Sequence, residues 1–303
     1  MRNKLLNSAV LFIAVVSAGC SLNASNEAPG QTAGKRATPT PRSSQDSDAD
    51  SSLRDMPAGR EDSNLLFGNP SEAGREPNNY LVERPQHVMS YNKSNGGPNW
   101  VSWHLDKSDL GDIRRGTFRP DPLLPPDMQI RPSDYKNSGY DRGHVCPSGD
   151  RTRTKEDNTA TFVMSNMLPQ AAALNQQVWK DLEDYSRYLV GRGDELYVVA
   201  GGSGSAERIG NNKVNVPAVC WKIIVVLPEG NGDLRRINAN TRVIAVSMPN
   251  REREEIADSK WAQWTTSVDQ LEKTTGYDFL AALPDSIENA LEKQVDSGRA
   301  ERS

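Results

Sequence analysis

Hydrophobic and polar positions divide the chain into a polar N-terminal part and a globular remainder. Residues 21–63 contain no Val, Ile or aromatic side chain. Such a segment cannot bury enough apolar surface to offset the entropy lost on ordering, so we expect a disordered tether there. From residue 64 onward apolar positions recur with the periods of folded elements, and no second linker or internal repeat follows. We therefore expect one globular domain over residues 64–298.

Short apolar segments within this domain predict β-strands. Residues 100–104 alternate as a strand does, and residues 195–200 and 221–227 are nearly continuous apolar runs followed by Gly or Pro. Runs of this kind are typical of buried strands. Two further strands are expected at residues 143–145 and 241–248.

A helical period appears over residues 174–190, where apolar side chains are three or four residues apart. Shorter helices are expected at residues 268–271 and 286–295, and the prolines of residues 119–126 predict an irregular loop. The pattern therefore indicates an α+β protein with a central, mostly antiparallel sheet flanked by helices.

The first twenty residues have the pattern of an export signal. Arg2 and Lys4 precede the mostly apolar residues 5–16, and small residues 17–19 then precede Cys20. This arrangement is typical of a secretory signal. The ending resembles a bacterial lipobox, in which Cys20 would carry the lipid and become the first mature residue. The alternative is ordinary cleavage before residue 19, with Cys20 incidental.

Charge and composition exclude several classes of protein. The 303 residues include 36 basic and 40 acidic side chains, which gives a net charge of −4 and excludes a uniformly basic surface. No apolar run is long enough for a polytopic membrane protein, and three cysteines are too few for a disulfide scaffold.

The charge is distributed unevenly along the chain. Residues 105–160 hold ten basic and ten acidic side chains, whereas the chain beyond residue 250 holds seven basic and twelve acidic side chains. A nucleic acid would therefore need a local basic groove, for which the candidates are Arg114, Arg115, Arg119, Arg142, Arg151, Arg153 and Lys155.

The densest cluster of residue types that can act in catalysis is Asp141-Arg142-Gly143-His144. A neutral imidazole is the natural general base near pH 7, and His144 is one of only three histidines. A lone histidine is more often structural. The adjacent Arg142 and a following helix with both an asparagine and a glutamate favour the catalytic interpretation.

Three motifs at fixed spacing give the chain a family resemblance. The DRGH sequence of residues 141–144 is followed by S-N-x-x-P-Q at residues 165–170 and by L-N-x-x-x-W-x-x-L-E at residues 174–183. Together they resemble the sugar-non-specific DNA/RNA endonucleases with a ββα-metal fold, the group that includes endonuclease G. The likeness extends over about residues 78–295. It implies a magnesium-dependent enzyme, with manganese as the alternative ion, that hydrolyses phosphodiester bonds of DNA and RNA.

The resemblance also implies roles for individual residues. His144 would activate the attacking water, and Asn175 would bind the metal through its amide oxygen. Glu183 lies eight residues later, about 12 Å along an α-helix, so it would hydrogen-bond a water held by the metal instead of binding the ion itself. The alternative for Asn175 is a helix N-cap. Asp141 is expected to be a structural hydrogen-bond acceptor, and Trp179 a core residue.

Arginines and amides complete the predicted site. Arg142 supplies positive charge suited to a phosphate or its transition state. The family uses a further arginine upstream. Arg114 and Arg115 are rivals for this position because one residue is deleted relative to the family pattern, and Arg114 is preferred. Asn166 and Gln170 could equally be amides that brace loops. The candidate substrate contacts are Arg115, Arg119, Asn166 and Gln170.

Two other functional classes fit parts of the sequence. A non-catalytic, nucleic-acid-binding surface lipoprotein would be expected to lack His144, Asn175 or Glu183, yet all three are present. A thiol enzyme could use Cys146, two residues after the histidine, but no acyl-transfer motif accompanies it. Relatives form dimers, and no residue here demands a homodimer.

The two cysteines of the globular part raise the question of a disulfide. Exported thiols tend to be paired, so a bridge between Cys146 and Cys220 is one expectation. The alternative is that both are small buried apolar residues that never meet.

Overall fold

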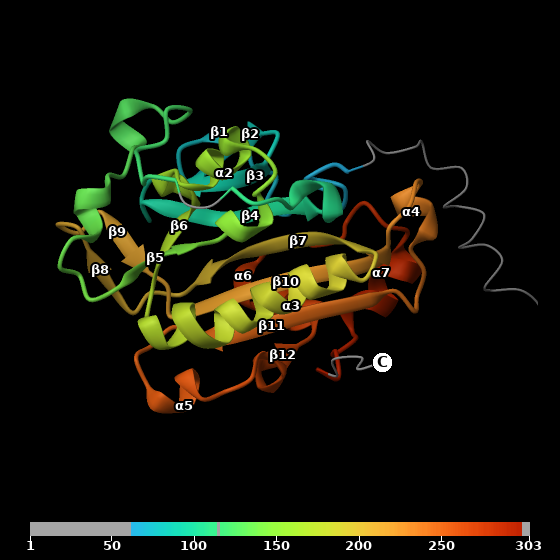
Figure 1. The fold of residues 1–303 in the computed structure, drawn as a ribbon. Helices are drawn as coiled ribbons and strands as arrows, with labels where there is room; N and C mark the ends of the chain where they lie inside the picture. Colours follow the sequence, from blue (N-terminus) through green and yellow to red (C-terminus); the bar gives the residue numbers. More distant parts are fainter. Residues whose placement is uncertain (1–61, 114–115, 299–303) are drawn as a thin grey trace, which may run out of the picture. The chain divides into compact units, whose positions relative to one another are not determined.

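The computed structural model describes residues 62–113 and 116–298, all within one compact unit. Its centre is an eight-stranded antiparallel sheet with the strand order β1-β2-β3-β4-β7-β10-β11-β12 (Figure 1). The strands are β1 (Arg75–Glu76), β2 (Asn79–Arg84), β3 (His87–Asn92), β4 (Gly97–Leu105), β7 (Asp194–Ser203), β10 (Val219–Pro228), β11 (Arg242–Pro249) and β12 (Thr265–Thr266).

Two small antiparallel pairs accompany this sheet: β5 (Asp141–His144) with β6 (Met167–Gln170), and β8 (Glu207–Ile209) with β9 (Val214–Val216). The α-helices are α2 (Lys155–Thr161), α3 (Trp179–Gly191), α4 (Asp233–Arg236), α5 (Glu254–Ala257), α6 (Val268–Thr275) and α7 (Asp285–Glu292). A π-helical turn, η6 (Leu174–Val178), leads into α3. Short 3₁₀ turns are η1 (Lys107–Asp109), η2 (Pro126–Met128), η3 (Pro132–Tyr135), η4 (Ser148–Asp150), η5 (Met164–Asn166) and η7 (Trp261–Trp264).

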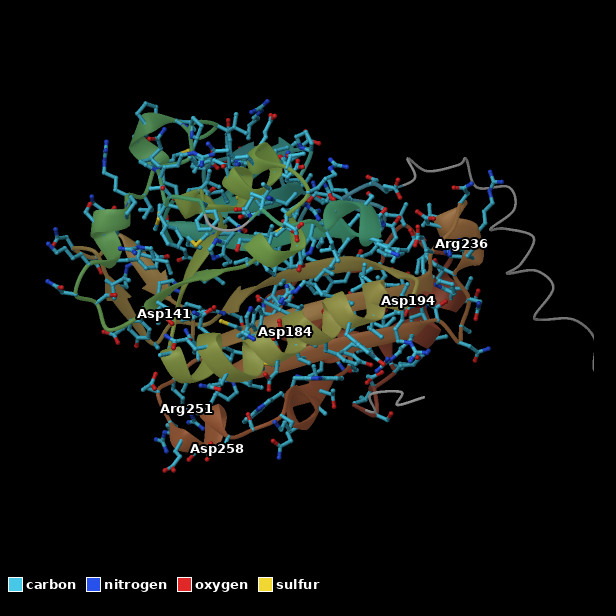
Figure 2. All side chains as sticks on the ribbon, in the orientation of Figure 1. Asp141, Asp184, Asp194, Arg236, Arg251 and Asp258 are labelled. Carbon is cyan, nitrogen blue, oxygen red and sulfur yellow. The ribbon has the colours of Figure 1, made fainter. Side chains whose placement is uncertain are left out.

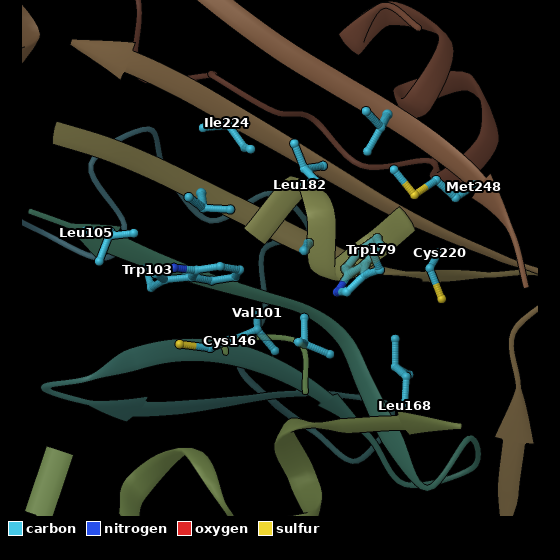
Figure 3. Packing of buried hydrophobic residues seen from close by; sticks show 14 of the residues in the cluster. Val101, Trp103, Leu105, Cys146, Leu168, Trp179, Leu182, Cys220, Ile224 and Met248 are labelled. Atoms are coloured by element: carbon cyan, nitrogen blue, oxygen red, sulfur yellow. The ribbon is translucent and has the colours of Figure 1, made fainter. Parts of the chain in front are cut away.

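Both faces of the sheet are covered by apolar layers. Along β10, Trp221, Ile223 and Val225 belong to one core cluster, while Cys220 and Ile224 belong to the other. This alternation follows from the two-residue period of a strand. Helix α3 packs on one face, with Leu182 near Ile224 and Trp179 near Cys220 (Figure 3), and α6 and α7 lie on the opposite face (Figure 1).

The fold confirms the α+β class, with an antiparallel sheet and the expected strands β4, β5, β7, β10 and β11. Residues 119–126 are irregular, as their prolines predicted. The sequence pattern did not predict β1, β2 and β3. Polar side chains that become buried, such as His87 and Ser90 at 0% exposure, interrupt the apolar pattern of β3.

Several expectations concern residues outside the described ranges. These are the export signal over residues 1–20, the tether over residues 21–61, the lipid attachment at Cys20, and the positions of Arg114 and Arg115. Among the described residues, no helix combines the length and apolar composition needed to cross a bilayer.

The disulfide expected as one alternative does not form. Cys146 and Cys220 are both free and fully buried. Cys146 follows β5, whereas Cys220 lies on β10 of the large sheet with its sulfur receiving a weak hydrogen bond from Gln170 Nε2 at 3.5 Å. Figure 3 shows the two sulfur atoms at separate places in the core. Both residues therefore act as small apolar residues.

Candidate active site

The β5–β6 pair and the helix that follows it carry the motif residues. In this pair Gly143 lies opposite Leu168, and His144 lies opposite Met167. A side chain at position 143 has no room, because a Cβ there would lie 1.9 Å from Gln170 Oε1. The glycine of the motif therefore allows β5 to lie directly against the buried Gln170, and this close contact fixes the position of the next residue, His144.

His144 has the environment of a neutral base. Its ring packs edge-on against Phe162, with centroids 4.8 Å apart, and lies 5.6 Å from the ring of Phe118. This burial lowers the pKa of His144 to about 4, since a buried charge is poorly solvated. The Nε2 atom is buried without a hydrogen-bond partner. The imidazole is thus unprotonated at neutral pH, as a general base requires.

Arg142 places a positive charge beside this base without a carboxylate partner. Its Nη2 donates to the carbonyl oxygen of Pro132 at 3.1 Å, and its guanidinium lies 5.2 Å from the ring centre of Phe118. None of the ion pairs among the described residues involves Arg142. Its charge therefore remains available to an anion such as a phosphate.

Asn175 has a fixed amide orientation. Its Nδ2 donates to Asp141 Oδ2 at 2.9 Å, and Gln176 Nε2 donates to the same oxygen at 2.8 Å. Figure 2 shows Asp141 beside the start of the helix that carries Asn175, with Asp184 farther along it. Because the amide nitrogen is engaged, Oδ1 is the atom of Asn175 left for another partner. Asp141 is a structural acceptor, as expected.

The helix that carries Asn175 begins as a π-helical turn, whereas a continuous α-helix was expected over residues 174–190. Asn175 is not the N-cap. The N-cap is Ala173, and no side chain caps the turn. One additional residue in a turn rotates the following residues by about 100°. Asn175 and Glu183 therefore do not keep the relative facing that an uninterrupted α-helix would give them, and the water-mediated role of Glu183 stays a prediction.

Glu183 lies against a lysine that the sequence analysis did not identify. Its Oε1 is 4.0 Å from Nζ of Lys222, and the exposed fractions of the two side chains are 15% and 2%. Burial raises the pKa of Glu183 to about 7, and the nearby charges of Lys222 and Arg187 partly oppose that rise. The Lys222 ammonium also lies 4.2 Å from the ring centre of Trp179. Glu183 is therefore a largely buried carboxylate that faces the ammonium group of Lys222.

A buried polar cluster extends from this pair. Asp150 accepts hydrogen bonds from Arg187 Nη1 at 2.7 Å and from Trp103 Nε1 at 3.1 Å. Lys222 is the member that the sequence could have revealed, because a charged residue stands in the middle of an otherwise apolar strand. Such a residue needs a buried partner, since an unpaired charge in a core is costly.

The structure corrects the predicted substrate contacts at Asn166 and Gln170. They are 0% and 1% exposed, so neither can reach a nucleic acid. Asn166 braces the chain after β5: it accepts from the backbone nitrogen of Cys146 and donates to the carbonyl oxygens of Cys146 and Thr161. Asn166 therefore has the loop-bracing role that was the alternative, whereas Gln170 is buried against Gly143, with Nε2 donating to Cys220 Sγ and Oε1 without a hydrogen-bond partner.

Two arginines expected in the groove are held by the protein itself. Arg151 is 3% exposed and donates to the carbonyl oxygens of Gln86 and His104. Arg119 is half-buried, and its Nη1 donates to the carbonyl oxygen of Thr159 at 2.8 Å. Arg151 thus has a structural role, and Arg119 keeps only part of its guanidinium for a ligand.

These residues fit a hard divalent cation. Asn175 offers a single oriented oxygen, and His144, Arg142 and Glu183 come from the adjoining elements β5 and α3. Magnesium binds oxygen ligands, keeps several of its waters, and is commonly held by only one or two protein groups. An amide oxygen with its nitrogen already engaged is a suitable ligand of this kind.

Comparisons with known proteins show the family of this chain. Residues 71–286 match the model of the DNA/RNA non-specific endonuclease family. A nuclease from Nostoc sp. (strain PCC 7120) is 48% identical over 238 residues, which cover 77% of this chain and 86% of that protein. The human mitochondrial nuclease EXOG is 31% identical over 216 residues, which cover 65% of this chain and 56% of that protein.

A solved structure shares the fold. The crystal structure of the EndoG/EndoGI complex, described in terms of the mechanism of EndoG inhibition, contains a chain similar to this one with a TM-score of 0.63 and 24% sequence identity. The alignment covers 75% of this chain and 93% of that chain. At this identity the likeness shows the arrangement of the sheet and helices.

Proposed function

Because the chain belongs to the DNA/RNA non-specific endonuclease family and is a nuclease, we propose that it is a magnesium-dependent endonuclease that cleaves both DNA and RNA. The observation that carries this proposal is the neutral imidazole of His144, with the uncompensated charge of Arg142 beside it and the amide of Asn175 oriented nearby by Asp141. Manganese is the alternative ion.

In the proposed reaction His144 takes a proton from the attacking water. The bond from the water oxygen to phosphorus forms as the bond from phosphorus to the leaving oxygen breaks, and the leaving oxygen takes its proton from solvent. Arg142 stabilises the negative charge that grows on the phosphoryl oxygens. The contact between Glu183 and Lys222 joins α3 to β10, and in this proposal Glu183 orders a water held by the metal.

A bound magnesium ion, held through Asn175 Oδ1, would supply positive charge to the phosphoryl oxygens and the leaving group. The chain's own contribution is to present that oxygen in one orientation. Asp141 does so by engaging the amide nitrogen.

The test is degradation of supercoiled plasmid and of a structured RNA by the purified chain. We expect cleavage of both in magnesium, arrest by EDTA, and recovery when magnesium is restored. His144→Ala should lower the rate by about 10²–10⁴-fold while the fold survives. Cleavage that continues in EDTA, or a variant that cuts within a few-fold of the parent, would contradict the proposal.

We further propose that the enzyme is exported and anchored to a membrane through lipid on Cys20. This proposal is compatible with either a monomer or a homodimer. The support is the basic start, apolar stretch and small residues before Cys20. Cys20→Ala should move the protein from the membrane fraction to the soluble fraction without changing nuclease activity. A parent protein that is already soluble, with its mature N-terminus at residue 19, would favour ordinary secretion.

A further inference from the structure

Carboxylate groups converge where α6, α7 and the segment between them meet, on the face of the sheet opposite α3. Their oxygens form two groups of three with one shared member, and within each group the oxygens lie within 4.8 Å of one another. The first group is Asp269, Glu272 and Glu292, and the second is Asp278, Glu288 and Glu292.

The shared member is buried with an unused oxygen. Glu292 is only 7% exposed, and its Oε1 has no hydrogen-bond partner. Such an atom is costly unless something occupies the space before it, because a buried carboxylate has lost its water. Glu292 offers a carboxylate oxygen to both groups, so the two groups meet at this residue.

The cluster has no cationic partner in the described part of the chain. None of the ion pairs formed there joins any of the five carboxylates to a lysine or arginine. A metal ion at this position would compensate the negative charge that the cluster gathers.

We propose that these five carboxylates bind a calcium ion, at a site separate from the active site. Calcium takes six to eight oxygen ligands at about 2.3–2.6 Å, so two ligands on opposite sides of the ion lie about 4.8 Å apart. The oxygens of each group lie within that limit. Magnesium fits less well, because it requires shorter, octahedral contacts and keeps its waters.

The ion would tie α6 to α7 through side chains of both helices. It would also hold the segment between them, which carries Asp278 and the buried Phe279, against the sheet. Calcium should therefore act on stability and leave the chemistry of phosphodiester cleavage unchanged.

The test uses the full chain carrying Asn175→Ala, so that the proposed catalytic cation ligand is absent. After chelation and dialysis, calorimetric titration with calcium chloride should show one ion per chain. The melting temperature should rise by about 5 °C when calcium reaches about a hundred times its dissociation constant. Adding Glu292→Gln should abolish both the binding and the rise, and should raise the melting temperature in EDTA because one negative charge is removed.

Two further variants keep the test decisive. Asp278→Asn changes an exposed member of the cluster and should weaken calcium binding at least tenfold, even if Glu292→Gln fails to fold. Glu254→Gln, a carboxylate on α5 outside the cluster, should bind calcium as the parent does. The proposal is overturned if the Asn175→Ala protein binds no calcium, which would mean that a proton occupies the cluster. It is also overturned if the foldable cluster variants bind calcium as tightly as their parent.

Discussion

Asp141 Oδ2 accepts a hydrogen bond of 2.9 Å from Asn175 Nδ2, which joins the first residue of β5 to the π-helical turn before α3. The same strand carries Arg142 and His144. One contact therefore couples the proposed metal ligand to the strand that bears the proposed base. It assigns Asp141 the role of a positioning residue.

We expect Asp141→Ala to raise the magnesium concentration required for half-maximal activity, because the amide of Asn175 loses the partner that fixes its oxygen. Activity should recover substantially at saturating magnesium, since the ligand itself remains. The matched control is Gln176→Ala, which removes the other donor to the same oxygen and should leave the magnesium requirement nearly unchanged. Equal shifts in the two variants would contradict a specific role for the Asp141–Asn175 contact.

The pKa of His144 predicts the acidic side of the pH profile. The folded-state pKa of about 4 lies below the ordinary value, so the ring is neutral and active above it. We expect kcat/KM to stay level from pH 7 to about pH 5 and then fall about tenfold per unit once the pH passes below that pKa. An acidic limb centred near pH 6.5 would indicate a solvent-exposed imidazole and would contradict the buried position of His144.

Stability must be followed in the same experiment. Burial holds the pKa of His87 well below its ordinary value of 6.5. The unfolded chain therefore binds a proton at His87 before the folded chain does, and stability falls as the pH drops below about 6.5. Circular dichroism at each pH separates loss of fold from loss of the base.

Asn175→Ala and Glu183→Gln should differ in their effects. The first removes the proposed ligand oxygen, so the magnesium requirement should rise far more than in the second. Glu183→Gln instead leaves Lys222 without its buried carboxylate partner, so it should lower the melting temperature more than Asn175→Ala does. Magnesium titrations and thermal unfolding of both variants check this, and a larger metal effect for Glu183→Gln would reverse the two assignments.

Gly143→Ala should destabilise the protein by about 1–3 kcal/mol, the usual cost of forcing atoms into a packed core. The added Cβ meets Gln170 Oε1 at 1.9 Å. Chemical denaturation should show much of this loss relieved in a Gln170→Ala background. Gly191→Ala serves as the control, because a Cβ there has no atom within 4 Å. If Gly143→Ala lowers the free energy of unfolding by the same amount in the Gln170→Ala background, the strain does not come from the contact with Gln170.

Two thiols per chain should react in unreduced, denatured Cys20→Ser protein, because Cys146 and Cys220 are free. In the native state both should resist alkylation. Burial raises the pKa of Cys220 to about 12 and that of Cys146 further in the same direction, so little thiolate is present. Absence of reactive thiols after denaturation would show that the two cysteines are bridged.

The sequence was sufficient for the elements with regular local patterns. Continuous apolar runs located β7 and β10, and a period of three to four residues located α3. The spacing of the motifs also predicted the roles of His144, Arg142, Asn175 and Glu183. It did not reveal β3, because polar side chains that become buried only in the folded chain interrupt its apolar pattern.

The partners of the functional side chains were decided by the tertiary structure. Asp141 and Asn175 are 34 positions apart in the chain, and Glu183 and Lys222 belong to a helix and a strand brought together by packing. The exposure of Asn166 and Gln170 could not be predicted either, because the sequence does not distinguish an amide side chain that braces a loop from one that lines a binding groove. Local sequence sets backbone periodicity and residue type, whereas burial, charge pairing and the orientation of an amide depend on atoms that only the folded chain brings near.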